Sequence, residues 1–311
     1  MSTSILRNTT ENPNRLKQLF GLVLPLAMKR HLLYLKHYRR FGNFRTPRLL
    51  SEKIQWRIIN DRRELLRHTC DKRTSKLLAL EVARRAGVDL MAPRELAWAA
   101  EMPDLLQVLR EKHLRRELPS RWVVKPNHSS GRAIMVEGEP DWSFIDRVAG
   151  SWTKDSRFDQ LHWIWPYTIA ARGLLAEEFI EASISPTEWQ VWMFHGRIEY
   201  VVAQQRIGEQ PHRSCFDREW RPVPSWFNRD TDALRISVPP QSWDRIQEIA
   251  HTLGDEWDMI RIDLYEDDRG GLWFGELTPY PAEGLFSTTA ESRMFDAQSG
   301  ENWLLPASQS S

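Results

Sequence analysis

Short apolar runs separated by turn residues dominate the second half of the chain and predict strands. Two of these runs, Met259–Leu264 and Leu272–Leu277, flank a polar, glycine-rich segment at 266–271, so the pattern predicts a β-hairpin. Further strands are predicted at 174–180, 188–194, 197–204 and 215–220, with a His195–Gly196 turn between the second and third. Successive strands joined by short connections indicate a largely antiparallel sheet.

Helical periodicity, with apolar residues three or four positions apart, alternates with strands in the first half. In this half, helices are predicted at 25–40, 51–60, 70–86, 103–118 and 142–152, and strands at 88–93, 121–126 and 133–136. One further helix is predicted at 242–257. Ser51 is the candidate N-cap of the second helix, and Gly87 is the candidate C-cap of the third. Residues 1–14 are predicted to lack regular structure. The mixture of helices and antiparallel strands predicts the α+β class.

The composition is that of an ordinary globular protein, but its charge is divided unevenly along the chain. Of 311 residues, 41% are hydrophobic and 27% are charged. Residues 1–50 contain ten Lys/Arg and one acidic residue, whereas the remainder carries a net charge of −8. The basic helix at 25–40 therefore fits two interpretations: it lies on a membrane surface or another anionic partner, or it packs on the main domain with its charges in water.

Location is predicted from the cysteines and from the lack of a long apolar segment. Cys70 and Cys215 are the only two cysteines, which excludes a disulfide framework and favours a reducing compartment. The sequence shows no signal peptide and no apolar run of the length needed to span a bilayer. We expect a cytoplasmic protein, with peripheral attachment to the inner face of the membrane as the alternative. No motif for nucleic-acid binding occurs, so no nucleic-acid partner is expected.

The hairpin at 259–277 carries the first candidate chemistry. Asp263 lies in its first strand and Glu276 in its second, and Arg261 shares a face with Asp263 by the period of two. A carboxylate within an apolar strand is costly unless it is paired. Hard oxygen ligands of this kind suit Mg²⁺, which commonly shares its coordination shell with substrate phosphates. The alternative is a surface hairpin whose carboxylates face water.

A second hairpin carries the opposite charge. The strand at 121–126 contains Lys125, and the small polar segment Asn127–Gly131 separates it from the next strand. Backbone N–H groups of such a loop can point at anionic oxygens, and the lysine adds a positive charge. The segment is not a Walker loop, because no Gly-Lys-Ser/Thr occurs and a strand follows. The alternative is an ordinary hairpin with a lysine at its end.

These features occur in a fixed order that resembles the ATP-grasp fold and, within it, the TupA-like branch named for teichuronopeptide biosynthesis. The resemblance covers roughly residues 45–290. Its branch-specific matches are Ser51–Trp56, Asn60–Arg62, Cys70–Lys72, Lys125–His128 and Gly275–Pro279. It implies two α+β subdomains whose antiparallel sheets clamp ATP, preceded by an N-terminal helical extension. The segments expected are 1–45 for the extension, 46–120 for N-terminal and central α–β parts, 121–180 for the small subdomain with the phosphate flap, and 181–311 for the large subdomain with the metal site.

The same resemblance implies a role for each candidate residue, with ATP and Mg²⁺ as cofactors. Lys72 and Lys125 would contact the phosphates under a flap formed by Asn127, His128, Ser129, Ser130 and Gly131. Glu177, Phe179 and Ile180 would hold adenine, and Glu188 the ribose. Asp263, Glu276 and Thr278 would bind Mg²⁺, and Arg261 would face the transferred phosphate as the catalytic residue.

The sequence departs from the usual pattern of the superfamily at three places. Thr278 stands where Asn is common, Ser129 stands where glycine is usual, and Tyr280–Gly284 replaces a glycine-rich run. A hydroxyl is a weaker metal ligand than an amide oxygen, and Ser129 reduces the backbone freedom of the flap. The geometry of the flap and of the segment after the second carboxylate strand therefore has to come from the structure.

The function implied is ATP-dependent amide formation through an acyl phosphate, with partners that are a carboxylate and an amine. By resemblance to the branch, the carboxylate would be a glycan uronic acid and the amine an amino acid, in polysaccharide biosynthesis. The alternatives are an ATP-grasp kinase acting on a hydroxyl group and a non-catalytic nucleotide-binding scaffold in surface-polysaccharide assembly. His128 is a candidate acid–base group, although a loop histidine is more often structural. Cys215 lacks the partners of a nucleophile.

Overall fold

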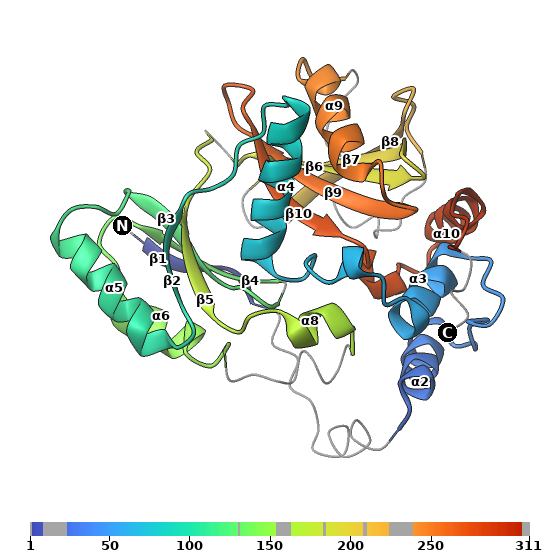
Figure 1. Cartoon of the computed structure of the whole chain (residues 1–311), viewed down its shortest axis with the longest axis horizontal. Coiled ribbons are helices and arrows are strands. Elements are labelled where there is room, and N and C mark those ends of the chain that lie inside the picture. The colour runs from blue at the N-terminus through green and yellow to red at the C-terminus, as the bar shows by residue number, and fades with distance from the viewer. Residues whose placement is uncertain are drawn as a thin grey trace. The chain divides into compact units, whose positions relative to one another are not determined.

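Two compact units make up the protein, and each is described separately. The structure is a computed structural model that describes residues 2–8, 24–129, 131–153, 163–182, 185–207, 210–223 and 239–306. The first unit comprises Met1–Leu24, Arg63–Ser75 and Pro93–Ile180, and the second comprises Pro25–Arg62, Lys76–Ala92 and Glu181–Ser311. Each unit contains one five-stranded sheet (Figure 1). The predicted α+β class is confirmed.

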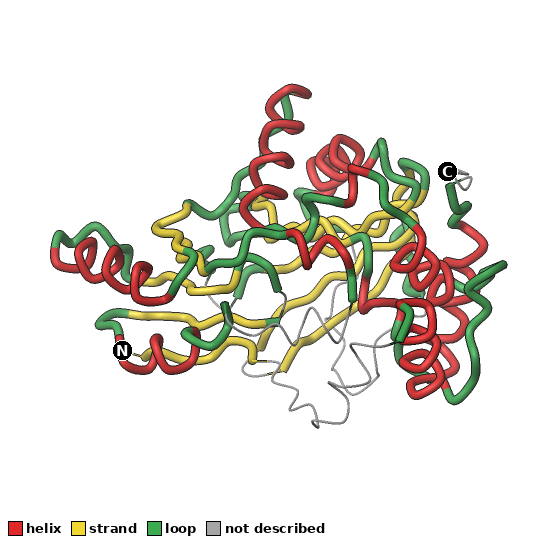
Figure 2. The backbone as a smooth tube through the Cα atoms, turned by 60° about the horizontal axis from the view of Figure 1, so that its bottom comes forward, coloured by secondary structure: helices red, strands yellow, loops and turns green. Residues whose placement is uncertain are grey.

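The sheet of the first unit is antiparallel throughout, with the strand order β1-β4-β3-β5-β2. Figure 2 draws the strands of the protein in yellow and its helices in red. Its strands are β1 (Ser2–Asn8), β2 (Glu95–Ala99), β3 (Arg121–Pro126), β4 (Arg132–Glu137) and β5 (Leu174–Glu178). The expectation of no regular structure at the N-terminus is wrong for β1, which pairs with β4. Residues 9–14 lie outside the described part of the chain. The strand expected at 88–93 is reduced to a single bridge at Met91.

Helices pack on one face of the first unit's sheet. They are α5 (Met102–Leu114) and α6 (Trp142–Ala149), and the unit also contains η1 (Glu64–Leu66) and α8 (Trp165–Ile169). Along β3, Trp122 and Val124 point into the hydrophobic core that α5 and α6 cover. Because side chains alternate along a strand, Val123 and Lys125 point to the opposite face. The packing of the helices thus leaves Lys125 on the face that they do not cover.

The sheet of the second unit is also antiparallel, with the strand order β10-β9-β6-β7-β8. Its strands are β6 (Thr187–Phe194), β7 (Arg197–Ile207), β8 (Gln210–Asp217), β9 (Met259–Glu266) and β10 (Leu272–Thr278). The hairpin predicted at 259–277 is confirmed as β9–β10. The predicted His195–Gly196 turn joins β6 and β7, and both residues have positive φ, as in a type I′ turn.

The second unit's helices are α2 (Leu26–Tyr38), α3 (Leu50–Asn60), α9 (Trp243–Gly254), η2 (Pro281–Gly284) and α10 (Ala290–Asn302). Helix α9 packs on the sheet, and its Gly254 lies against Met193 and Ile262. Helix α3 contacts α2, η2 and α10. The prediction that Ser51 is the N-cap is wrong, because α3 begins one residue earlier, at Leu50. The hydroxyl of Ser51 instead donates to Asp296.

Helix α4 (Lys72–Ala86) has its first four residues in the first unit and the rest in the second. Gly87 ends it with φ 74°, as predicted. The N–H of Gly87 donates to Arg84 O at 3.2 Å and that of Val88 to Ala83 O at 2.9 Å, which is the Schellman pattern. No helix in the described ranges has an apolar stretch long enough to cross a bilayer.

Candidate functional site

Four side chains of the β9–β10 hairpin form one connected polar cluster. Arg261 donates from Nε to Asp263 Oδ1 at 2.7 Å and from Nη2 to Asp263 Oδ2 at 2.6 Å. The same Nη2 lies 3.2 Å from Glu276 Oε1 and 3.4 Å from Thr278 Oγ1. Thr278 in turn donates to Glu276 Oε1 at 2.9 Å. The candidate catalytic and metal-binding residues of the sequence therefore lie together in the structure.

The register of the hairpin produces this cluster. Glu276 pairs with Asp263, and Thr278 pairs with Arg261. A bulge at Gly275 shifts the register between Phe274 and Glu276. A Cβ at Gly275 would lie 2.7 Å from Asp263 O, so the close approach of the two strands requires a glycine at this position.

Burial and charge make the cluster electrostatically strained. Asp263 is only 2% exposed, and burial raises its pKa well above the ordinary value. The neighbouring carboxylates of Glu276 and Glu188 raise it further, while Arg261 lowers it. Burial is the largest single influence on the pKa of Arg261 and lowers it, but the charge and hydrogen bonds of Asp263, together with the charges of Glu276 and Glu188, make the net shift upward. A second cation between Asp263 and Glu276 would stabilise both carboxylates in the charged form.

A row of polar side chains extends the cluster across the sheet. Glu188 on β6 is buried and accepts from Gln190 Nε2 at 2.8 Å and from Gln204 Nε2 at 2.7 Å. Arg213 on β8 donates to Gln204 Oε1. Sequence reasoning found Glu188 but missed Gln190 and Gln204, which donate to it, and Arg213, which donates to Gln204. Gln190 could have been found, because it stands two positions after Glu188 and therefore on the same face.

The donor set of the hairpin fits a magnesium ion that completes its shell with other oxygens. Asp263, Glu276 and Thr278 offer two carboxylates and one hydroxyl within a connected cluster. Within the described residues, no group of three His, Cys, Asp or Glu side chains forms a metal site by itself. Magnesium usually takes one or two carboxylates and keeps waters or substrate phosphates as its remaining ligands. The residues present thus fit a metal ion that binds with a phosphorylated substrate.

The first unit brings a second set of predicted residues together. Lys125 on β3 forms an ion pair with Glu177 on β5. Both lie on the face of the sheet that α5 and α6 leave uncovered, because Val123 pairs with Glu177 and Lys125 with Leu175. Lys72, the first residue of α4, donates from Nζ to the carbonyl oxygen of Ser129 in the loop.

Asn127 anchors the loop between β3 and β4 through both the oxygen and the nitrogen of its side-chain amide. Its Oδ1 accepts from Arg73 N at 3.1 Å, and its Nδ2 donates to Ala171 O at 2.8 Å. Its carbonyl accepts from Lys72 N at 3.3 Å. Gly131 has φ 72°, which favours glycine. Ser130, also predicted for the flap, lies outside the described residues.

Two polar atoms in this loop are buried and, within the described structure, lack a hydrogen-bond partner: Nδ1 of His128 and Oγ of Ser129. Such atoms carry a desolvation cost unless a ligand or water satisfies them. Burial, followed by the positive charges of Arg172, Lys72 and Arg132, lowers the pKa of His128 to about 4. His128 is therefore neutral at pH 7, and the loop fits a phosphate through neutral donors beside Lys72.

The remaining predicted nucleotide-binding residues follow Glu177 at the end of β5. The N–H of Phe179 donates to Arg121 O at 3.3 Å. The Arg121 guanidinium lies 4.5 Å from the centre of the Phe179 ring. Ile180 is buried. The segment after β5 is thus held against the start of β3 through Phe179.

Comparison with known families gives one match, and it covers most of the chain. The family model described as TupA-like ATPgrasp matches residues 52–304. No curated protein matches the chain.

Solved structures of ligases show a distant similarity. They include D-alanyl-alanine synthetase A from Vibrio cholerae O1 biovar eltor (14% identity, TM-score 0.45, covering 73% of this chain and 60% of that one). D-alanine–D-alanine ligase from Bacillus anthracis, in complex with ATP, has 17% identity and a TM-score of 0.41, over 69% of this chain and 56% of that one. L-amino acid ligase from Bacillus licheniformis has 14% identity and a TM-score of 0.38, over 68% and 43%. The chain thus spans 43–60% of the length of these three proteins, and at such identities and scores we take nothing about its site from them.

Proposed function

The chain belongs to the TupA-like ATP-grasp family, and we propose that it is an ATP-dependent ligase that joins a carboxylate to an amine. The observation that carries this proposal is the cluster on β9–β10, where Arg261 binds Asp263 and reaches Glu276 and Thr278. The buried carboxylate of Asp263, with the Arg261 guanidinium and the partly exposed Glu276 carboxylate beside it, favours a metal-bound phosphate over a passive surface hairpin, since burial of a charged group is costly without a function or a partner.

We propose a role for each predicted residue. Lys72 and Lys125 bind the phosphates of ATP, and the loop Asn127–Gly131 covers them with N–H groups. Glu177 and the backbone of Phe179 and Ile180 bind adenine, and Glu188, held by Gln190 and Gln204, accepts from the ribose hydroxyls. Asp263, Glu276 and Thr278 hold Mg²⁺, which would neutralise phosphate charge.

The proposed reaction has two steps. An oxygen of the substrate carboxylate attacks the γ-phosphorus of ATP, so that the bond to the β,γ-bridging oxygen breaks and ADP and an acyl phosphate form. The amine then attacks the acyl carbon, the bond to the phosphate oxygen breaks, and the amine releases a proton. In this proposal Arg261 stabilises negative charge on the transferred phosphoryl group, since positioning plus charge stabilisation account for most of such catalysis.

We propose a uronic-acid group of a glycan as the carboxylate and an amino acid as the amine. The support for this substrate class is the family to which the chain belongs. The basic segment before Glu52 is compatible with an anionic polymer, because residues 12–51 contain no Asp or Glu.

A phosphate-release assay with Mg–ATP and paired acids and amines tests the proposed activity. We expect phosphate release that requires both an acid and an amine and that is abolished by Asp263→Asn. The matched control is Asp268→Asn, which changes an exposed carboxylate in the turn of the same hairpin and should leave the activity unchanged. Full activity in the Asp263→Asn variant would contradict the metal assignment.

Two other outcomes of the same assay identify the alternatives. A phosphorylated product that forms without an amine would indicate a kinase. Binding of Mg–ATP without turnover of any acid–amine pair would indicate a nucleotide-binding scaffold. Intact Asp263, Glu276, Lys72 and Lys125 favour the enzyme over the scaffold.

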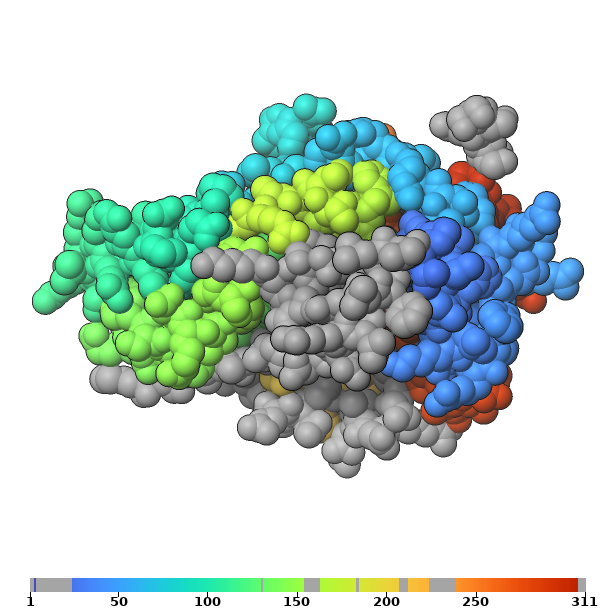
Figure 3. Space-filling view, turned by 90° about the horizontal axis from the view of Figure 1, so that it is seen from below, coloured from blue at the N-terminus to red at the C-terminus, as the bar shows by residue number. Residues whose placement is uncertain are grey.

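We also propose that α2 and the loop after it bind the surface of an anionic membrane. Met28, Leu32 and Phe41 are 49%, 48% and 68% exposed, and Lys36 and Arg39 beside them are exposed as well. Atoms of this segment lie at the surface in Figure 3, in blue. Exposed apolar side chains next to cations suit the boundary between lipid headgroups and acyl chains.

Sedimentation with lipid vesicles tests this location. The protein should sediment with vesicles that contain anionic lipid and much less with neutral ones, and Leu32→Glu should abolish sedimentation. Leu114→Glu, on the exposed end of α5, is the control and should have no effect. Equal sedimentation of the wild type and the Leu32→Glu variant would contradict the proposed surface.

A further inference from the structure

Helix α3 consists largely of polar residues but is buried, and the proposed reaction leaves it without a role. Its buried polar residues are Ser51, Glu52, Lys53, Gln55 and Arg57. The helix also contains the stretch at 51–56 that resembles the TupA-like branch. Burying polar groups is costly unless they are hydrogen-bonded, so the partners of these side chains indicate what the helix does.

Arg57 connects α3 to both strands of the β9–β10 hairpin. Its side chain is fully buried, and its Nη1 donates to Met259 O at 2.9 Å and to Pro279 O at 3.1 Å. Its Nη2 donates to Asp258 Oδ1 at 2.8 Å. One nitrogen of the guanidinium thus binds two backbone carbonyls that are twenty residues apart in the sequence.

Both carbonyls flank the proposed metal site. Met259 is the first residue of β9, two positions before Arg261, and Pro279 follows Thr278, the last residue of β10. Because β9 and β10 are antiparallel, the start of β9 and the end of β10 lie side by side, at the end of the hairpin opposite its turn. Arg57 therefore ties the two strands together just beyond their last ladder pair.

Other contacts fix the guanidinium itself. It lies 4.2 Å from the centre of the Trp303 ring. Trp303 Nε1 donates to Asp258 Oδ2 at 2.9 Å, so that one carboxylate joins the indole and the guanidinium. Asp61 Oδ2 lies 3.7 Å from Arg57 Nε, one turn along α3. A planar donor held on several sides in this way has little freedom to shift.

The register that Arg57 fixes decides whether the metal ligands meet. A one-residue slip would turn side chains to the other face of the sheet, and the bulge at Gly275 already offsets β10 between Phe274 and Glu276. We propose that Arg57 is a positioning residue that holds β9 and β10 in the register in which Asp263 and Glu276 bind one Mg²⁺. This inference rests on the proposed function of that pair.

Lys53 provides a matched control. It lies one helical turn before Arg57, is buried, and also donates to backbone carbonyls, those of Gly300 and Trp303. Its partners belong to the end of α10 and to the residue after it, and not to the hairpin. Removing either cation should lower the stability of the fold, but only the loss of Arg57 should affect the metal site.

Two measurements on purified full-length Arg57→Met, Arg57→Lys and Lys53→Met variants test the proposal. The first is amide hydrogen exchange of residues 259–279 without metal or nucleotide, which does not depend on the proposed activity. The second is calorimetric titration of ADP at increasing Mg²⁺ concentrations. Arg57→Met should speed exchange in the hairpin and weaken Mg²⁺ affinity by about 10- to 100-fold, the range typical of groups that orient metal ligands.

Arg57→Lys keeps the charge but loses the planar fork, so it should give a smaller loss in the same direction; it also decides the question if Arg57→Met does not fold. Lys53→Met should leave Mg²⁺ affinity and hairpin exchange as in the wild type. Equal effects of Arg57→Met and Lys53→Met, or wild-type Mg²⁺ affinity with both Arg57 substitutions, would overturn the proposal. If the wild type binds ADP without any Mg²⁺ dependence, the proposed function fails. The exchange measurement still tests whether Arg57 holds β9 and β10 together.

Discussion

His128 shows how the surroundings of one residue decide between chemical roles. The loop position makes it a candidate acid–base group, but burial and the charges of Arg172, Lys72 and Arg132 lower its pKa to about 4. At pH 7 it is therefore a neutral hydrogen-bonding group. The positive charge near the loop comes from its neighbours.

The titration of His128 by NMR checks this assignment. We expect a midpoint near pH 4 for His128 in the free protein. Because the folded protein disfavours the charged form, His128 contributes stability that is present above pH 6.5 and is lost as the pH falls toward about 4. A midpoint near 6.5 would show that the side chain is solvated and would contradict its burial.

Gly275 illustrates a backbone requirement at a single position. A Cβ there would lie 2.7 Å from Asp263 O, and backbone cannot yield as a side chain can. Gly275→Ala should therefore disturb the β9–β10 bulge and weaken Mg²⁺-dependent ADP binding about tenfold or more, as measured by calorimetry. Gly254→Ala is the control, because its Cβ would meet only the side chains of Met193 and Ile262. Comparable losses of Mg²⁺ dependence in both variants would contradict the special role of Gly275.

The sequence predicts residues of the β9–β10 cluster where a charged residue interrupts an otherwise apolar strand. Arg261 and Asp263 stand out in β9 for this reason, and Glu276 in β10. Gln204 and Arg213 do not stand out, because polar residues are common in strands. The role of Gln204 comes from its bond to Glu188, and that of Arg213 from its pairing with Gln204. Their roles depend on strand order, which local patterns do not contain.

Elements with a clear hydrophobic period were predictable, and those formed through distant partners were not. Strand β9 and helix α9 have strong patterns and lie close to their predicted bounds. Strand β1 is largely polar, and its partner β4 lies more than a hundred residues away. Helix α10 has no clear apolar face, but it buries Phe295 and Asp296 against the rest of the second unit.

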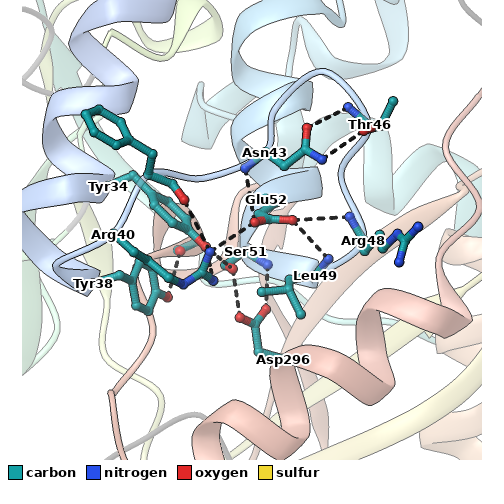
Figure 4. A network of polar contacts seen from close by, with 12 residues as sticks. Tyr34, Tyr38, Arg40, Asn43, Thr46, Arg48, Leu49, Ser51, Glu52 and Asp296 are labelled. Carbon is teal, nitrogen blue, oxygen red and sulfur yellow. Dashed lines mark hydrogen bonds and ion pairs between the residues drawn. The ribbon is translucent and has the colours of Figure 1, made fainter.

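Asp296 links α10 to α3 and predicts a pH effect on stability. It accepts from Ser51 N at 2.6 Å and from Ser51 Oγ at 2.7 Å, within the polar network of Figure 4. Burial raises its pKa from 3.8 to about 6. Between these values the folded protein holds a proton that the unfolded chain has released, so the stability that Asp296 contributes falls as the pH rises from about 4 to 6.

Urea unfolding of the wild type and of Asp296→Asn between pH 4 and pH 8 tests this effect. Because Asn does not titrate, the stability of the wild type relative to the variant should fall between about pH 4 and pH 6 and stay constant above pH 7. A difference that is constant across the range, or that grows with pH, would show that burial does not raise the pKa of Asp296.

At the scale of the whole molecule, the predicted site residues fall into two sets that belong to different units. Lys72, Lys125 and Glu177 belong to the first unit, and Arg261, Asp263 and Glu276 belong to the second. The sequence predicted both sets and the family, and the ATP-grasp fold is confirmed by the match over residues 52–304. That both sets bind one nucleotide remains a prediction. A pattern of neighbouring residues in one unit contains no information about the other unit.

Calorimetric titration of Mg–ATP into the wild type and into one variant from each unit tests this central claim. Lys125→Gln and Glu276→Gln should each weaken the same binding event by about tenfold or more, since each removes a charge that we propose to contact the nucleotide or its metal. Lys112→Gln in the first unit and Glu256→Gln in the second change charges that belong to neither set, and these variants should bind as the wild type does. Wild-type affinity for Mg–ATP in either Lys125→Gln or Glu276→Gln would show that the two units do not share the ligand.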